Sequence, residues 1–235
     1  MTHPDMATAA ERLDVGVQTP AHEFAAVSTS FHVNRYDADM TAWATRRIGY
    51  GDWLPPLLVR GLTDDEFASV GITPYSSTHE DNCNNVVQAG WVALLGGIAG
   101  TSITNKFSAV YGRIGVGTSA TAVAYAQTYL QGDTGSASTT SYYQLVSGAP
   151  AIATAASPAT LTLTASFASG NANFAWAEFG SDNWNVSGVT AQSLGASEVF
   201  FNRGVSSQGT KASGQTWTAT ETISFGYPSG SGTVS

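Results

Sequence analysis

Cysteine is nearly absent from this chain of 235 residues, since Cys83 is the only one. A single cysteine excludes an intrachain disulfide and leaves no thiol cluster for a structural zinc ion. We therefore expect the fold to depend on a hydrophobic core. A chain of this length is long enough for one sizeable core, or for a core with an extended arm.

Long apolar runs are also lacking. The run from Val92 to Ala99 is rich in glycine and much shorter than the roughly 18 residues needed to cross a bilayer. The stretch from Met1 to Leu13 is polar and acidic, without the apolar segment of a secretory signal peptide. We therefore expect neither a membrane span nor a signal peptide.

Charge is scarce and unevenly distributed. Charged residues make up 11% of the chain, about half the fraction usual in globular domains. Residues 1–81 hold 12 acidic and 5 basic residues (net −7), and residues 82–235 hold 5 and 4 (net −1), which gives the total of −8. The only basic pair is Arg46-Arg47, so the composition argues against nucleic-acid binding. After residue 82, uncharged polar residues must supply most of the polar surface. This suits a subunit covered by neighbours, and a Ser/Thr-rich extracellular β domain is the alternative.

The first 81 residues predict short helices joined by loops. Thr19-Pro20 begins one candidate helix, residues 37–47 a second, and Thr63 with Glu66 forms the capping box of a third. Helices this short are unstable alone, so their aromatic residues must pack against the body or a neighbour. We expect residues 1–81 to be a docking arm or small helical subdomain and residues 82–99 to hold a connecting helix. The expected docking residues are Phe24, Phe31, Trp43 and Trp53.

The remainder predicts an antiparallel β domain over residues 100–227, followed by a flexible tail at 228–235. Residues 160–167 and 215–225 alternate apolar with Thr or Ser side chains, and Gly/Ser/Asn turns separate the strands. A short helix is expected at 120–130. The predicted fold class is mainly β: an antiparallel β-sandwich-like domain preceded by an N-terminal arm of short helices and loops.

One segment matches a nucleotide-binding motif. Gly115-Val116-Gly117-Thr118-Ser119-Ala120 has the pattern G-x-G-x-x-A between an expected strand and an expected helix. The rest of that context is missing, because antiparallel strands follow and the only nearby acid, Asp133, lies in a loop. We predict no cofactor, and we interpret the glycines as a tight turn.

Histidine chemistry is not favoured either. No histidine has a partner at metal-ligand spacing, and we interpret His79-Glu80-Asp81 as a solvated cap and not as acid–base machinery. The histidines are His3, His22, His32 and His79. We therefore predict no metal site and no catalytic residue.

Glu178 lies between Trp176 and Phe179 in a strand that should be buried, so its carboxylate needs a partner. Arg203 and Lys211 are the candidates. A catalytic acid is one interpretation, and a structural ion pair that fixes the strand register is the interpretation we prefer.

Two longer segments carry a family resemblance: Ala172-Asn173-Phe174-Ala175-Trp176-Ala177-Glu178-Phe179-Gly180 and the block from Asn202-Arg203-Gly204 through Gly209-Thr210-Lys211 to Thr216-Trp217. With Gly115-Val116-Gly117-Thr118, they resemble structural proteins of tailed phages of actinobacteria, described as minor capsid, head decoration or minor tail proteins. The likeness covers about residues 82–225. Glu178, Arg203 and Lys211 match charged residues that recur in that family.

The resemblance implies a non-enzymatic virion subunit, a capsid decoration or cement protein that docks on the shell beside the major capsid protein, with a trimer favoured by analogy. A tail or baseplate component is one alternative. A receptor- or glycan-binding module is another, with exposed aromatics such as Trp184 as contact residues. No nucleic-acid or membrane partner is expected.

Overall fold

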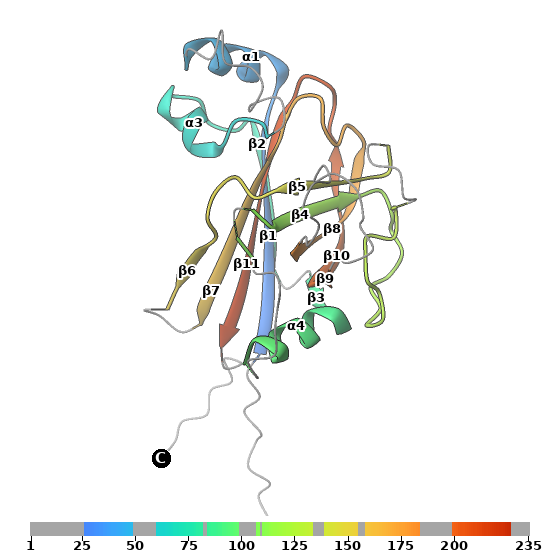
Figure 1. Cartoon of the computed structure of the whole chain (residues 1–235). Helices are drawn as coiled ribbons and strands as arrows, with labels where there is room; N and C mark the ends of the chain where they lie inside the picture. Colours follow the sequence, from blue (N-terminus) through green and yellow to red (C-terminus); the bar gives the residue numbers. More distant parts are fainter. Residues whose placement is uncertain are drawn as a thin grey trace, which may run out of the picture.

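The computed structural model describes residues 26–48, 60–81, 84–98, 107–108, 110–133, 139–154, 158–183 and 199–226. Almost half of these residues lie in strands, which form two antiparallel sheets (Figure 1). The first, sheet A, has the strand order β2-β1-β11-β7-β6. Its strands are β2 (Ser76–Asp81), β1 (Ala26–Tyr36), β11 (Thr216–Gly226), β7 (Ala159–Phe167) and β6 (Ala151–Ala153).

The second, sheet B, has the order β3-β10-β8-β4-β5, with β9 paired to β8. Its strands are β3 (Asn84–Val86), β10 (Asn202–Thr210), β8 (Ala175–Asn183), β4 (Gly112–Gly117), β5 (Ser141–Leu145) and β9 (Val199–Phe200). The mainly β, antiparallel, sandwich-like fold expected from the sequence is confirmed.

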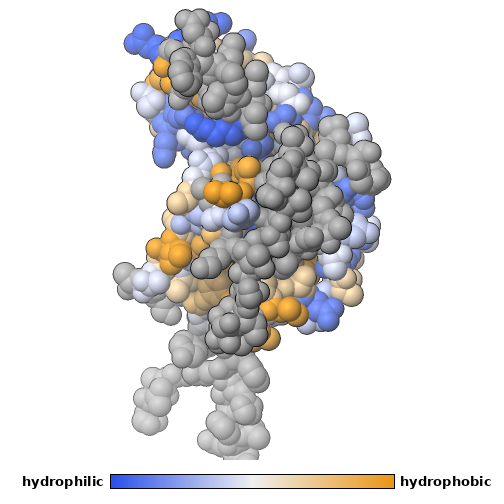
Figure 2. Space-filling view, viewed as in Figure 1, coloured by the Kyte–Doolittle hydropathy of each residue, from blue (hydrophilic) through white to orange (hydrophobic). Residues whose placement is uncertain are grey.

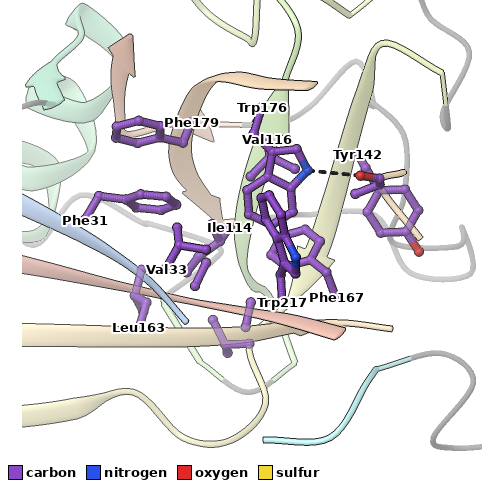
Figure 3. Packing of buried hydrophobic residues seen from close by; sticks show 14 of the residues in the cluster. Phe31, Val33, Ile114, Val116, Tyr142, Leu163, Phe167, Trp176, Phe179 and Trp217 are labelled. Atoms are coloured by element: carbon purple, nitrogen blue, oxygen red, sulfur yellow. Dashed lines mark hydrogen bonds between the residues drawn. The ribbon is translucent and has the colours of Figure 1, made fainter. Parts of the chain in front are cut away.

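The main core lies between the two sheets and is dominated by aromatic rings (Figure 3). Phe31 of sheet A stacks on Phe179 of sheet B with ring centroids 4.0 Å apart. Trp176 of β8 lies edge-on to Trp217 of β11, with centroids 4.8 Å apart. These rings bury large apolar areas across the sandwich, so they supply much of the driving force for joining the sheets.

The alternation predicted at 160–167 and 215–225 is present in β7 and β11. Leu163 and Ala165 of β7 and Ala219 and Ile223 of β11 are buried. The intervening threonines form cross-strand pairs, such as Thr164 with Thr220, on the opposite face. Strands β7 and β11 therefore have a largely apolar inner face and a hydroxyl-rich outer face.

The expected boundary at residue 81 is wrong. Residues 26–36, expected in the arm, form β1, which pairs with β11 from Ala26↔Gly226 to Tyr36↔Thr216. Residues 76–81 form β2, which extends the same sheet. The β body thus spans residues 26 to 226 and includes both strands. Residues 1–25 and the expected tail at 228–235 lie outside the described residues.

Two helices of the described part of the chain lie at one end of sheet A, and we call residues 37–48 and 60–75 the helical tip. Helix α1 (Ala38–Arg47) is capped by Asp37, and α3 (Asp64–Ser69) has the predicted Thr63/Glu66 capping box. The tip has a small core of its own, in which Tyr36 stacks on Phe67 at 3.6 Å. This core continues from the last residue of β1, so the tip is an outgrowth of sheet A.

The helix expected at 82–99 is present as α4 (Gln88–Ile98), preceded by the short strand β3. Val87, at its start, packs with Leu130, Tyr143 and Phe200. A Cβ on Gly90 would lie 2.1 Å from the carbonyl oxygen of Phe201, so the helix approaches the chain too closely there for any side chain. The first turn of α4 therefore packs closely against sheet B.

Candidate functional site

A buried ionic centre in sheet B is formed by Glu178 of β8 and Arg203 of β10. Both side chains are fully buried. Arg203 donates from Nε to Glu178 Oε2 at 2.7 Å, and its Nη2 lies 2.7 Å from the same oxygen. The structure thus contains an ion pair between Glu178 and one of its two candidate partners. It joins two neighbouring strands of sheet B.

The carboxylate of Glu178 also receives backbone N–H groups from the loop that follows β4. Gln131 donates to Oε2 at 2.8 Å, and Gly132 donates to Oε1 at 2.6 Å. Ser119 makes a longer contact with Oε1 at 3.4 Å. Several donors on one buried carboxylate offset much of its desolvation, and they fix both ends of the loop.

Arg203 holds the middle of the same loop. Its Nη1 donates to the Thr121 carbonyl at 2.9 Å and to Gln127 Oε1 at 3.1 Å. Gln127 in turn accepts from the Ala124 N–H and donates to the Ala122 carbonyl. The ion pair therefore organises residues 119–132 into a defined loop, which we call the anchored loop.

The helix predicted at 120–130 is wrong, because this segment is irregular and has a single short turn at residues 125–126. Within it, the Thr121 carbonyl accepts from Arg203 and the Ala124 N–H donates to Gln127, where a helix would use these groups internally; Gln131, just beyond it, donates to Glu178. The glycines before it serve close packing: a Cβ on Gly117 would lie 2.4 Å from Glu178 Oε1, and one on Gly115 would lie 2.8 Å from the Tyr143 ring. Because no helix follows the turn, Gly115–Ala120 does not have the strand–turn–helix context of a dinucleotide-binding motif.

Lys211 does not pair with Glu178, so its assignment to that ion pair is wrong. Its ammonium donates to the Ala168 carbonyl at 2.9 Å and to Asn173 Oδ1 at 2.8 Å. The side chain is buried, and burial lowers its pKa to about 7. Lys211 thus ties the end of β10 to the β7–β8 connection through neutral oxygens.

A second buried ion pair was not predicted. Arg113 of β4 donates to Asp182 of β8 from Nε at 2.8 Å and from Nη2 at 2.5 Å, and both side chains are buried. The guanidinium also lies 4.5 Å from the ring centroid of Tyr143. Burial, followed by the charge of Asp182, raises the pKa of the Tyr143 hydroxyl well above its usual value.

The predicted docking residues have different positions. Phe31 is fully buried against Phe179, so its assignment as a docking contact is wrong. Trp43 on α1 is 45% exposed and available for contact. Phe24 and Trp53 lie outside the described residues, as does Trp184, the proposed contact residue of the receptor-binding alternative.

The described histidines lie on the outer face of sheet A. His79 of β2 contacts Asp81 Oδ1 at 2.9 Å with both side chains exposed, and the His32 ring lies edge-on to it at 5.7 Å. Within the described ranges, no group of His, Cys, Asp and Glu residues has the geometry of a metal site. His3 and His22 lie outside the described residues.

The buried acids and bases are sealed from solvent. Glu178, Arg203, Arg113, Asp182 and Lys211 are each at most 1% exposed, so a substrate has no direct access to them. Their hydrogen bonds connect strands and loops. The arrangement can therefore fix strand register and loop conformation.

Among the described residues, no helix is long and apolar enough to cross a membrane. No protein-family model, curated protein or solved structure matches the chain.

Proposed function

We propose that this protein is a non-enzymatic structural subunit of a bacteriophage particle, a decoration subunit that docks on the capsid shell and stabilises it. The resemblance of residues 82–225 to actinobacterial phage structural proteins suggests this class. One structural observation supports it most: after residue 84, the described charged side chains lie almost entirely inside the β body.

After residue 84, every described charged residue except Asp133 is buried. The buried set is Arg113, Glu178, Asp182, Arg203, Lys211 and Glu221. The described surface of this region is therefore almost uncharged. A free monomer with such a surface tends to associate, whereas a subunit surrounded by neighbours has little need of surface charge.

The uncharged surface includes an apolar stripe. Val92 and Leu95 of α4 are 64% and 60% exposed, and they follow Gln88 at helical spacing on one side of the helix. The Gln88 N–H donates to the carbonyl of Tyr125, whose side chain is 59% exposed. The first turn of α4 thus adjoins the anchored loop, and in this proposal Val92 and Leu95 provide a contact surface for a neighbouring subunit.

The helical tip provides a different surface. None of the described charged residues of the tip is buried. Trp43 is exposed and lies beside Arg46 and Asp39. In this proposal the tip makes the polar, salt-sensitive contacts and α4 makes the apolar ones. The sealed position of Glu178 and Arg203 supports a structural and not a catalytic role for that pair.

The experiment is reconstitution onto phage particles that lack the protein. A truncation at residue 82 is unsuitable, because it deletes β1 and β2 from sheet A. The variants are therefore a chain that begins at Ala26, the point variant Trp43→Ala, and the double variant Val92→Asp/Leu95→Asp. Ile152→Asp is the matched control, since Ile152 is 74% exposed on the separate strand β6.

We expect the wild type to bind the particles in fixed stoichiometry. Its affinity should fall as the salt concentration rises, because the tip carries the exposed charge. At least one of the tip or α4 variants should fold but bind at least tenfold more weakly, and Ile152→Asp should bind normally. Equal binding by all variants contradicts the assigned surfaces. Location of the wild type only at the tail end favours a tail or baseplate component.

A further inference from the structure

A groove lies where the helical tip overhangs the outer face of sheet A. Its volume is about 460 Å³, and Figure 2 shows the molecule hollowed below the tip. The floor is formed by Thr162 and Thr164 of β7 and Thr220 of β11. One wall is formed by α3 and the residues before it, and the opposite wall by the 147–151 segment. The groove thus joins the charged tip to the uncharged sheet.

The floor offers hydroxyl groups in a fixed array. Thr164 and Thr220 are cross-strand partners with hydroxyl oxygens 3.2 Å apart, and Thr162 lies two residues along the same strand. Two hydroxyls together have two O–H donors and four lone pairs. Their mutual hydrogen bond uses one of each, so the pair keeps one donor and three acceptor positions for a ligand.

The wall behind the floor is held rigidly by Asp64. Its Oδ1 accepts from the Tyr36 hydroxyl at 2.8 Å and from the Thr218 hydroxyl at 2.6 Å. Its Oδ2 accepts from the Asn34 amide at 2.9 Å. These bonds fix α3 relative to strands β1 and β11, so the width of the groove is set before any ligand enters.

The rim is equally well ordered. Arg60 donates to both oxygens of Glu66, at 2.8 and 3.0 Å, and Glu66 also accepts from the Thr63 N–H at 2.8 Å. Asp65 is exposed beside this pair. The rim therefore presents carboxylate acceptors and guanidinium donors in fixed positions, an arrangement that avoids the entropy cost of ordering them on binding.

The chemistry of the lining selects the ligand class. One basic residue, Arg60, stands against Asp64, Asp65 and Glu66, so the groove has a net charge of −2 and repels polyanions. It has no aromatic or large aliphatic lining residue to favour an apolar ligand. Hydroxyls that both donate and accept are matched best by a ligand made of hydroxyls, and the volume falls in the range of small-molecule sites.

We propose that this groove binds a neutral oligosaccharide, whose hydroxyls pair with Thr164 and Thr220 on the floor and with Asp65 and Arg60 on the rim. This site is separate from the α4 stripe and Trp43, and it does not depend on the docking role. It gives the outer, hydroxyl-rich face of sheet A a function that particle assembly does not require.

The test uses the purified full-length chain and three neutral trisaccharides: maltotriose, cellotriose and triacetylchitotriose. Binding is followed by chemical-shift changes of backbone amides. The test variant is Thr164→Val/Thr220→Val, which keeps the side-chain shape and removes the floor hydroxyls. Thr160→Val is the control, since Thr160 lies on the same face of β7 outside the groove lining. Spermidine serves as a cationic probe.

We expect at least one trisaccharide to produce saturable shifts at the amides of residues 162–164 and 220. The double variant should bind at least tenfold more weakly, and Thr160→Val should change affinity less than about twofold. If no trisaccharide binds at a concentration of about 10 mM, which would nearly saturate a site with a Kd of about 1 mM, the proposal is overturned. Binding that persists in the double variant places the sugar elsewhere, and binding of spermidine alone assigns the groove to cations. Trp43→Ala should bind the trisaccharide normally, so this result is independent of particle docking.

Discussion

The helical tip and the β body use charge in opposite ways. In the tip, residues such as Asp39, Arg46 and Asp65 are exposed, and the side chains of the ion pair Arg60–Glu66 are 32% and 21% exposed. In the body, the pairs Glu178–Arg203 and Arg113–Asp182 are at most 1% exposed. The tip thus keeps its charge at the surface, whereas the two buried pairs of the body connect strands and loops.

The difference has an energetic meaning. A partly exposed pair contributes little, because water screens it and competes for its hydrogen bonds. A buried pair is costly to form, yet removal of one partner leaves an unpaired charge in a dry environment. Substitution of matched residues in the two regions therefore tests the comparison directly.

The largest effect is expected at Glu178. Glu178→Gln leaves the Arg203 guanidinium buried without its carboxylate, and we expect the free energy of unfolding to fall by about 3–5 kcal/mol. The control is Glu66→Gln in the tip, for which about 1 kcal/mol is expected from a half-exposed pair and a weakened cap. Urea denaturation measures both. Equal losses would show that burial does not distinguish the regions, and a lost activity with unchanged stability would show that Glu178 is catalytic.

The second effect concerns Lys211 and pH. Its pKa is lowered by burial from 10.5 to about 7, so below pH 7 the folded protein bears the full cost of a buried ammonium. Between about pH 7 and 10.5 the unfolded chain binds a proton that the folded chain does not, so this group makes stability rise with pH. We expect Lys211→Met to reduce the slope of stability against pH in that window by about 1.4 kcal/mol per unit. An unchanged slope contradicts the lowered pKa.

The third effect concerns the contact between Gly117 and Glu178. A Cβ at residue 117 would lie 2.4 Å from Glu178 Oε1, so Gly117→Ala must displace the carboxylate or the strand. We expect a loss of about 1–3 kcal/mol, as for other overpacked sites. Gly170→Ala is the control, because a Cβ there meets nothing within 4 Å and its φ lies outside the left-handed region. Thermal unfolding measures both variants. Equal melting temperatures for Gly117→Ala and Gly170→Ala would contradict this account.

Sequence patterns predicted the parts of the fold that depend on neighbouring residues. The alternation in β7 and β11, helix α1 and the α3 capping box are all local patterns, and all are present. Strand β1 was missed although Phe31 and Val33 alternate with polar residues. The inner face of β1 also includes Thr29 and Arg35, which hide the pattern, and its partner β11 lies far along the chain.

The buried charges show the same limit. The sequence indicated that Glu178 needs a partner but left Arg203 and Lys211 as alternatives. Glu178 lies opposite Val205, and the register of β10 shifts between Val205 and Gly209, which places Lys211 beyond the irregularity. The Arg113–Asp182 pair depends on the register of β4 against β8, and no local pattern encodes that register.

The smallest effect on stability is expected at Trp43, and it sharpens the comparison most. Trp43 and Phe31 were predicted together as docking residues, yet Trp43 is 45% exposed in the tip and Phe31 is fully buried in the body. Trp43→Ala should lower stability by about 1 kcal/mol, since much of the ring is already in water. Phe31→Ala should cost about 3–5 kcal/mol through the cavity it leaves against Phe179.

If the tip is a contact surface, Trp43→Ala weakens binding to particles far more than it weakens the fold, whereas Phe31→Ala weakens both in proportion to the unfolded fraction. Chemical denaturation and particle binding, measured on the same two variants, separate these outcomes. Loss of stability without loss of binding in Trp43→Ala would remove the tip from the contact surface and leave α4 as the remaining candidate.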